Sequence, residues 1–201
     1  GKKLLPDPPI ASIGYQASIV ITPQQEADMD IKATLNNLLI PYTSNYAGTL
    51  LPGIREYTVT PGEKTTTISG KGKAGLKQEE NYYFFYLPVC YKGITGKSYA
   101  YYNTSRSKNL YLPASVDENY SYDIQLPENL TLCTPIQEKK IDNPIGSFKI
   151  TLTSEGSSLH IELALQIKKQ LITPAEYPAF RSLITEWTDR TRKPILFKTV
   201  Q

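Results

Sequence analysis

The sequence is short of the residues that carry most protein chemistry. Its 201 residues include two cysteines, one histidine, one tryptophan and one methionine. Cys90 and Cys133 lie far apart and fit no zinc or redox spacing, which excludes a zinc finger and a CxxC redox site. We expect two buried free thiols, with a disulfide as the alternative in an oxidising compartment.

The chain also lacks a strong charge of either sign and any long apolar run. Its 22 basic and 19 acidic residues are spread evenly and give a net charge of +3, too little for a nucleic-acid surface. No segment approaches the roughly 20 apolar residues of a membrane span, and we expect no signal peptide within these residues. Because the chain starts at Gly1 without a methionine, we expect it to be a piece of a longer protein. We find no calcium loop and predict no cofactor.

Apolar residues make up 40% of the chain, and their spacing predicts strands. Residues 14–22 and 29–35 alternate apolar and polar side chains, as half-buried strands do. Residues 55–70 read as a hairpin about Pro61-Gly62, and residues 148–172 as a long hairpin about Glu155-Gly156. Shorter strands are expected in "SYAYYN", "KNLYLPA", "YSYDIQL" and "NLTLCT".

Other segments lack a regular alternation of apolar and polar residues. Residues 82–87 are aromatic or apolar at every position, which predicts a strand buried on both faces. The glycine-rich and charged residues 71–80 are expected to form a loop, and residues 141–147 a turn. The acidic pairs Glu79-Glu80 and Asp117-Glu118 are expected in solvated loops or turns.

One helix is predicted near the end of the chain. Pro178 suits the first turn, and Phe180, Leu183, Ile184 and Trp187 form one apolar stripe at helical spacing. Pro194 ends the helix, and residues 195–200 return to a strand. Because so short a helix is unstable alone, we expect it to lie on a sheet or to plug one end, with Trp187 as its anchor.

The sequence thus predicts an all-β fold, an antiparallel β-sandwich with one C-terminal α-helix followed by a final strand. Residues 1–11 read as an extended lead-in and residues 12–201 as the sandwich domain. If there are two subdomains, their boundary is expected within residues 70–80, where the composition turns polar.

Two groups of residues are candidates for a site. A cysteine hydrolase would need Cys90 or Cys133 with His160 and Asp189, but His160 lies on the polar face of its strand, where a solvated histidine is ordinary. Tyr99 and Tyr101 share one strand face and could stack on sugar rings, although tyrosines at a sheet edge usually cover the core. Two or more exposed coplanar rings would favour the sugar-binding interpretation.

The second half of the chain resembles a known family. The segments "LYLPASVDENYSYDIQLPENLTL" and "ITPAEYPAFRSLITEW…KPILFK" are similar to the β-rich C-terminal domain of unknown function that follows the transglutaminase-like core in bacterial exported proteins. The resemblance is best over residues 108–198 and loose over residues 12–35. The motifs that carry the resemblance are residues that pack in the core or form turns.

The resemblance implies an immunoglobulin-like β-sandwich accessory domain of an exported, periplasmic or cell-surface protein. The Cys-His-Asp triad of that family would lie in the core, so no catalytic residue is implied here. Our first hypothesis is therefore a non-catalytic domain that packs against this core or another protein. The alternatives are a carbohydrate-binding module that uses Tyr99 and Tyr101, and a small cysteine hydrolase.

Overall fold

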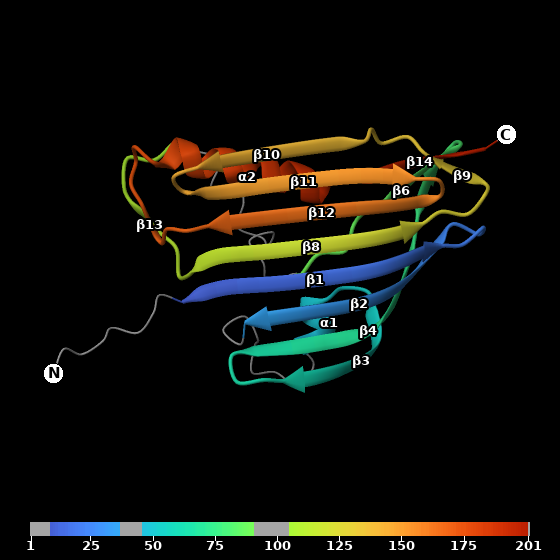
Figure 1. Ribbon diagram of the computed structural model, residues 1–201, viewed down its shortest axis with the longest axis horizontal. Helices are drawn as coiled ribbons and strands as arrows, with labels where there is room; N and C mark the ends of the chain where they lie inside the picture. Colours follow the sequence, from blue (N-terminus) through green and yellow to red (C-terminus); the bar gives the residue numbers. More distant parts are fainter. Residues whose placement is uncertain (1–8, 37–45, 91–104, 201) are drawn as a thin grey trace.

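The computed structural model describes residues 9–36, 46–90 and 105–200, which form one large sheet and two small ones (Figure 1). The large sheet has eight strands in the order β10-β11-β12-β8-β1-β2-β4-β3. In chain order these are β1 (Ile10–Ile21), β2 (Glu26–Asn36), β3 (Ile54–Pro61), β4 (Thr65–Gly75), β8 (Ser115–Gln125), β10 (Gln137–Asn143), β11 (Gly146–Glu155) and β12 (Ser158–Ile167). The strand predicted from residue 14 begins earlier, at Ile10.

Period-two alternation gives this sheet one buried and one exposed face. The inward side chains of β12 are Leu159, Ile161, Leu163, Leu165 and Ile167, and each is at most 2% exposed. The partner strand β11 joins β12 through a two-residue loop, where Gly156 adopts a φ of +59°. A left-handed φ at the first loop position favours glycine, which accounts for the predicted hairpin at Glu155-Gly156.

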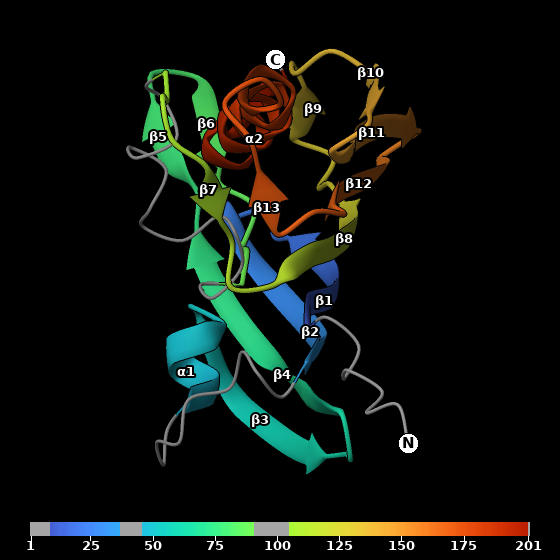
Figure 2. The same ribbon diagram turned by 90° about the vertical axis from the view of Figure 1, so that its left-hand side faces the viewer.

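Two small sheets and two helices lie on the buried face. One sheet has the order β5-β6-β14-β9, and the other pairs β13 with β7. Their bounds are β5 (Lys77–Glu79), β6 (Tyr82–Phe85), β7 (Leu110–Tyr111), β9 (Leu130–Leu132), β13 (Leu171–Ile172) and β14 (Ile195–Thr199), and the helices are α1 (Tyr46–Leu50) and α2 (Tyr177–Arg192). Figure 2 shows α2 end-on, between these small sheets and strands β10 to β12.

The predicted anchors of α2 are all in the core. Phe180, Leu183 and Trp187 are fully buried, and Ile184 is 2% exposed. The indole of Trp187 meets the Tyr120 ring at 5.7 Å and the Phe148 ring edge-on at 6.4 Å between centroids. Aromatic pairs in these tilted and edge-on arrangements add to the stabilisation from buried area.

The ends of α2 follow from local sequence. Pro178 lies in the first turn as predicted, and the helix ends before Pro194. One turn upstream, Thr173 and Glu176 form a reciprocal box: the backbone N–H of Thr173 donates to Glu176 Oε2 at 3.1 Å, and the N–H of Glu176 to Thr173 Oγ1 at 3.4 Å. This Thr-x-x-Glu pattern is the sequence signature of a capping box. The signature is present in the sequence, but the box was not predicted.

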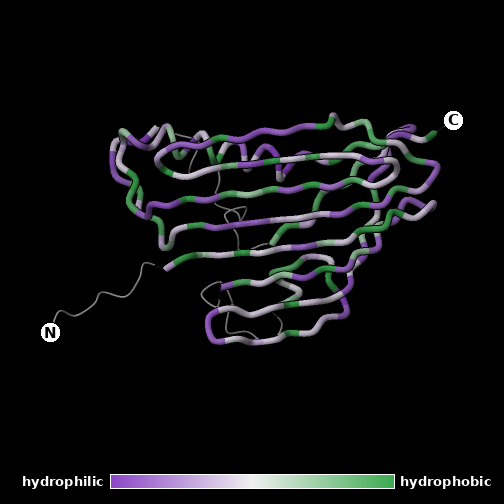
Figure 3. The backbone as a smooth tube through the Cα atoms, in the orientation of Figure 1, coloured by the Kyte–Doolittle hydropathy of each residue, from purple (hydrophilic) through white to green (hydrophobic). Residues whose placement is uncertain are grey.

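Strand β10 forms one edge of the large sheet and was not predicted. It reads Gln-Glu-Lys-Lys-Ile-Asp-Asn, which has no apolar alternation, and Figure 3 shows it as mostly hydrophilic. Polar contacts to α2 hold it: Arg190 donates to Gln137 at 2.7 Å, and Lys139 pairs with Glu186. Because charged residues on an edge strand discourage pairing with other chains, this composition protects the edge.

Two further expectations about loops were wrong. Residues 71–80 are mostly strand, since β4 runs to Gly75 between β2 and β3, and β5 follows at Lys77. The glycines permit close packing, because a Cβ on Gly70 would stand 2.3 Å from the carbonyl oxygen of Glu56. The turn expected over residues 141–147 shrinks to the two residues between β10 and β11.

The fold class is confirmed: the chain is mostly β, with antiparallel sheets and a C-terminal helix followed by a final strand. One pair departs from the antiparallel rule, because β1 and β8 run parallel in the middle of the large sheet. A parallel pair needs a long crossover, and here β2 to β7 supply it. Nothing in a strand's own sequence shows which neighbour it will find at such a distance.

Candidate functional surfaces

The triad that can be written from the sequence is not assembled. Cys90 is buried in the core, whereas Cys133 is exposed after β9, and neither forms a disulfide within the described residues. The expectation that both thiols are buried is therefore wrong for Cys133. Asp189 lies on α2 and pairs with Lys193 at 2.7 Å. Within the described residues, no thiol–imidazole–carboxylate chain exists, and no group of three metal-ligating side chains is placed to hold an ion.

His160 instead belongs to a charged cluster on the exposed face of the large sheet. Its Nδ1 lies 2.7 Å from Asp123 Oδ1, and its Nε2 lies 3.2 Å from Glu162 Oε1. Lys149 on β11 stands 3.9 Å from the other oxygen of Glu162. The hydrogen bond to Asp123, followed by the one to Glu162, raises the pKa of His160 above its ordinary value. The cluster therefore favours an imidazolium held between two carboxylates.

Small side chains surround this cluster and leave the exposed face shallowly hollowed. One hollow of about 380 Å³ crosses five strands, and Gly14, Asn119, Ser121 and Ala164 are among the residues that line it. Register places Gly14, Asn119 and Ala164 in one row across β1, β8 and β12. An antiparallel sheet commonly leaves such a polar face to water, so this surface needs no ligand to account for it.

The buried face holds polar groups that the sequence did not reveal. Glu118, expected in a solvated loop, is 2% exposed on the inward side of β8. The alternation of Val116, Glu118, Tyr120 and Tyr122 carried this information, since every second residue of β8 points inward. Burial, with a smaller effect of the Glu118 charge, raises the pKa of Tyr120, while the Tyr122 hydroxyl donates to the carbonyl of Pro88 at 2.6 Å. Tyr120 and Tyr122 are therefore part of the buried core.

An aromatic surface lies on the small sheet, on β6 and its neighbours. The strand predicted to be buried on both faces is buried on one: Tyr83 and Phe85 point inward, but Tyr82 is 37% and Tyr86 48% exposed. Lys77 lies over the Tyr86 ring at 5.2 Å, and Lys198 stands opposite Tyr82 in the register. The prediction failed because, among the described residues, only the face of this strand that carries Tyr83 and Phe85 is packed against the core. We call Tyr82, Phe84 and Tyr86 the aromatic surface.

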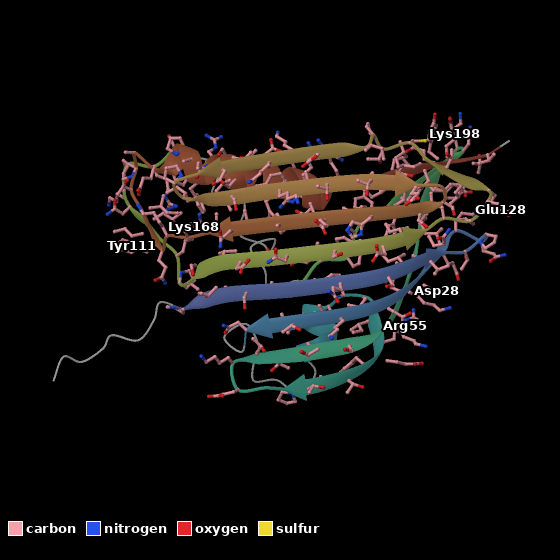
Figure 4. All side chains as sticks on the ribbon, in the orientation of Figure 1. Asp28, Arg55, Tyr111, Glu128, Lys168 and Lys198 are labelled. Carbon is pink, nitrogen blue, oxygen red and sulfur yellow. The ribbon has the colours of Figure 1, made fainter. Side chains whose placement is uncertain are left out.

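A second apolar surface lies at the opposite end of the molecule. Tyr111 on β7 is 71% exposed, the highest value among the large hydrophobic residues that the structure describes. Its partner across the ribbon is Leu171, 41% exposed. Figure 4 labels Tyr111 and Lys168 at this end, and Glu128 and Lys198 at the other. We call Tyr111 and Leu171 the terminal surface.

Tyr99 and Tyr101, the predicted sugar-binding pair, lie outside the described residues. Neither helix of the described residues has the length and apolar composition that a membrane span requires.

These observations define a β-rich domain with exposed apolar surfaces and no assembled catalytic triad in its described part. Residues 81–197 match the model of a family described as "Domain of Unknown Function with solved-structure structure (DUF3858)", and the chain belongs to this family. A search of the curated proteins finds no match.

One solved structure is similar to this chain. It is the crystal structure, at 2.00 Å resolution, of a "putative protease" from Parabacteroides distasonis ATCC 8503. The two chains are 29% identical and superpose with a TM-score of 0.52. The similarity covers 61% of this chain and 24% of that one, so the region of likeness spans about a quarter of the similar structure.

Proposed function

We propose that this chain is a non-catalytic accessory domain that follows the transglutaminase-like core of an exported bacterial protein and packs against that core. The observation that carries the proposal is the similarity to 24% of a much longer "putative protease", in which most of the chain lies outside the likeness. The arrangement of the described residues supports it, because His160 and Asp189 are engaged elsewhere and Cys90 is buried.

In this proposal the chemistry belongs to the core. There a cysteine thiolate attacks an amide carbonyl, and a histidine takes up and returns the proton. The accessory domain holds the catalytic core in position. Its large sheet is made rigid by the packing of Trp187 and its neighbours, and it presents fixed surfaces to the catalytic core. The proposal places the protein in the periplasm or at the cell surface, which fractionation of the source bacterium would test.

A peptidase and amidase assay on the isolated chain tests whether this domain is non-catalytic, as proposed. We expect no turnover above background, and no change in a variant that carries both Cys90→Ser and Cys133→Ser. The matched experiment uses the full-length gene product, where deletion of this domain should weaken the activity of the core. Turnover by the isolated chain that disappears in the double variant would establish a cysteine hydrolase instead.

Carbohydrate binding is the second candidate, and the aromatic surface is the observation that favours it. Exposed tyrosine rings stack on the flat apolar faces of sugars, and both Tyr82, at the start of β6, and Tyr86, directly after its end, are exposed. Lys77 and Lys198 could donate hydrogen bonds to hydroxyl or carboxylate groups of a glycan. A glycan array decides this candidate: binding that is lost in Tyr86→Ala and retained in Tyr111→Ala would support it, and an empty array would remove it.

A further inference from the structure

We infer that the terminal surface is where this domain docks against the part of the longer protein that precedes it. The inference rests on the proposed function, because it takes the partner to be the catalytic core of the same polypeptide. It goes further by assigning the contact to Tyr111 and Leu171, and by excluding the aromatic surface at the opposite end.

The first step is where the chain enters the domain. The backbone N–H of Ser115 donates to the carbonyl of Pro9 at 3.1 Å, and Ile10 pairs with Ser115 in the parallel register of β1 and β8. Any polypeptide that precedes Pro9 therefore reaches the domain at this end. A tethered partner is present at high effective concentration near its attachment point, so even a small surface there can form a stable contact.

The second step is that Tyr111 stands on a rigid support. Leu110 and Ile172 point inward from the same ribbon and are buried, while Tyr111 and Leu171 face outward. The backbone N–H of Leu112 donates to the carbonyl of Gln170 at 2.8 Å, which holds β7 to the segment before β13. A tyrosine on a held backbone has only two side-chain torsions to restrict, so it loses little conformational entropy on docking, which is why tyrosines often anchor interfaces.

The third step is the chemistry of the partner. Lys168 is exposed three residues before Leu171, and Arg106 lies over the ring of the buried Tyr177 at 5.9 Å, where α2 begins. Apolar anchors with cationic neighbours fit a partner surface that has an apolar pocket and an acidic rim. The aromatic surface has no comparable link to the incoming chain, since Tyr82 on β6 pairs with Lys198 on the last strand, β14.

Hydroxyl-radical footprinting tests the inference directly. Side-chain oxidation is compared by mass spectrometry between the isolated 201-residue chain and the full-length polypeptide. We expect Tyr111 and Leu171 to be oxidised several times more slowly in the full-length protein, while Tyr82 and Tyr86 react equally in both. Tyr82 and Tyr86 are the matched control, because they are exposed tyrosines of the same chain at the opposite end.

The other outcomes separate the inference from the proposed function. Protection of Tyr82 and Tyr86 with none at Tyr111 would overturn the inference, but would leave an accessory domain that docks through its aromatic surface. No protection at either surface would overturn both.

A charge-inserting variant gives a second readout. Tyr111→Glu should leave the circular dichroism of the isolated chain unchanged, because the ring is exposed. In the full-length protein it should split one joint unfolding transition into two, whereas Tyr86→Glu should not. A full-length Tyr111→Glu protein that still unfolds jointly would count against the inference even if footprinting shows protection.

Discussion

The two faces of the large sheet are built from the same strands but differ in burial and in charge. On the inner face of β12, Ile161 is 1% exposed and packs in a continuous apolar core. The next residue, Glu162, points outward and takes part in the His160 cluster. The comparison teaches that adjacent residues of one strand can carry unrelated physical roles, because a pleated strand alternates its side chains between faces.

The largest expected effect comes from the inner face, where α2 seals the core. Trp187→Ala should lower the free energy of unfolding by about 3–5 kcal/mol, because it removes a fully buried indole and leaves a cavity between Tyr120 and Phe148. Urea unfolding followed by circular dichroism measures the loss. A decrease below about 1 kcal/mol would mean that the helix does not close the core.

The next prediction tests the two faces on one strand. Ile161→Ala should cost about 2–5 kcal/mol, whereas Glu162→Ala should change stability by no more than about 1 kcal/mol, because exposed charge pairs contribute little. Both variants are measured by the same denaturant titration, and each is the control for the other. Equal losses in the two variants would contradict the assignment of the faces.

A smaller effect is expected at the start of α2. Thr173→Ala removes the hydroxyl that accepts from the backbone N–H of Glu176, and should destabilise the protein by about 1 kcal/mol. Thr173→Ser retains the hydroxyl and serves as the control. Thermal unfolding compares the two, and a Ser variant as unstable as the Ala variant would show that the contact is not the cause.

The smallest effect lies on the outer face, in the protonation of His160. Its pKa is raised in the folded protein, so protonation stabilises the fold below the ordinary value of about 6.5. That contribution disappears as the pH rises through the folded pKa, and should stay below about 1 kcal/mol because the ring is exposed.

This prediction has a clean measurement, because His160 is the one histidine of the sequence. A proton NMR titration should give a single imidazole midpoint above about 6.5. Asp123→Asn should move that midpoint down, because the first cause of the shift is the hydrogen bond to Asp123. An unchanged midpoint would show that the contact does not persist in solution.

Sequence patterns predicted the parts of the fold that depend on the local spacing of apolar residues or on proline and glycine at the ends of elements. The apolar stripe of α2, Pro178 at its first turn and the hairpin at Glu155-Gly156 are all confirmed. Errors arose where the pattern was present but ambiguous. Residues 82–87 are apolar at every position, and only the arrangement of the sheets left Tyr82 and Tyr86 outside. The buried Glu118 followed the alternation of its strand, yet its charge led us to place it in a loop.

The candidate surfaces were less predictable, because a surface is made by residues that are distant in the sequence. Pairing of β7 with β13 brings Tyr111 opposite Leu171, and pairing of β12 with β8 brings His160 to Asp123. Neither pairing can be read from one strand alone. Of the predicted site residues, Tyr99 and Tyr101 lie outside the described structure, so sugar binding by this pair stays a prediction.

The sequence by itself determined that this chain is β-rich, that one amphipathic helix and a strand close it, and which side of each regular strand is apolar. Each of these depends on the spacing of residues within a single element. The tertiary structure alone decided that β1 lies parallel to β8, that a helix and two small sheets cover the large sheet, and that exposed tyrosines collect at opposite ends. These depend on contacts between distant segments, whose free energy exists only once the chain has folded.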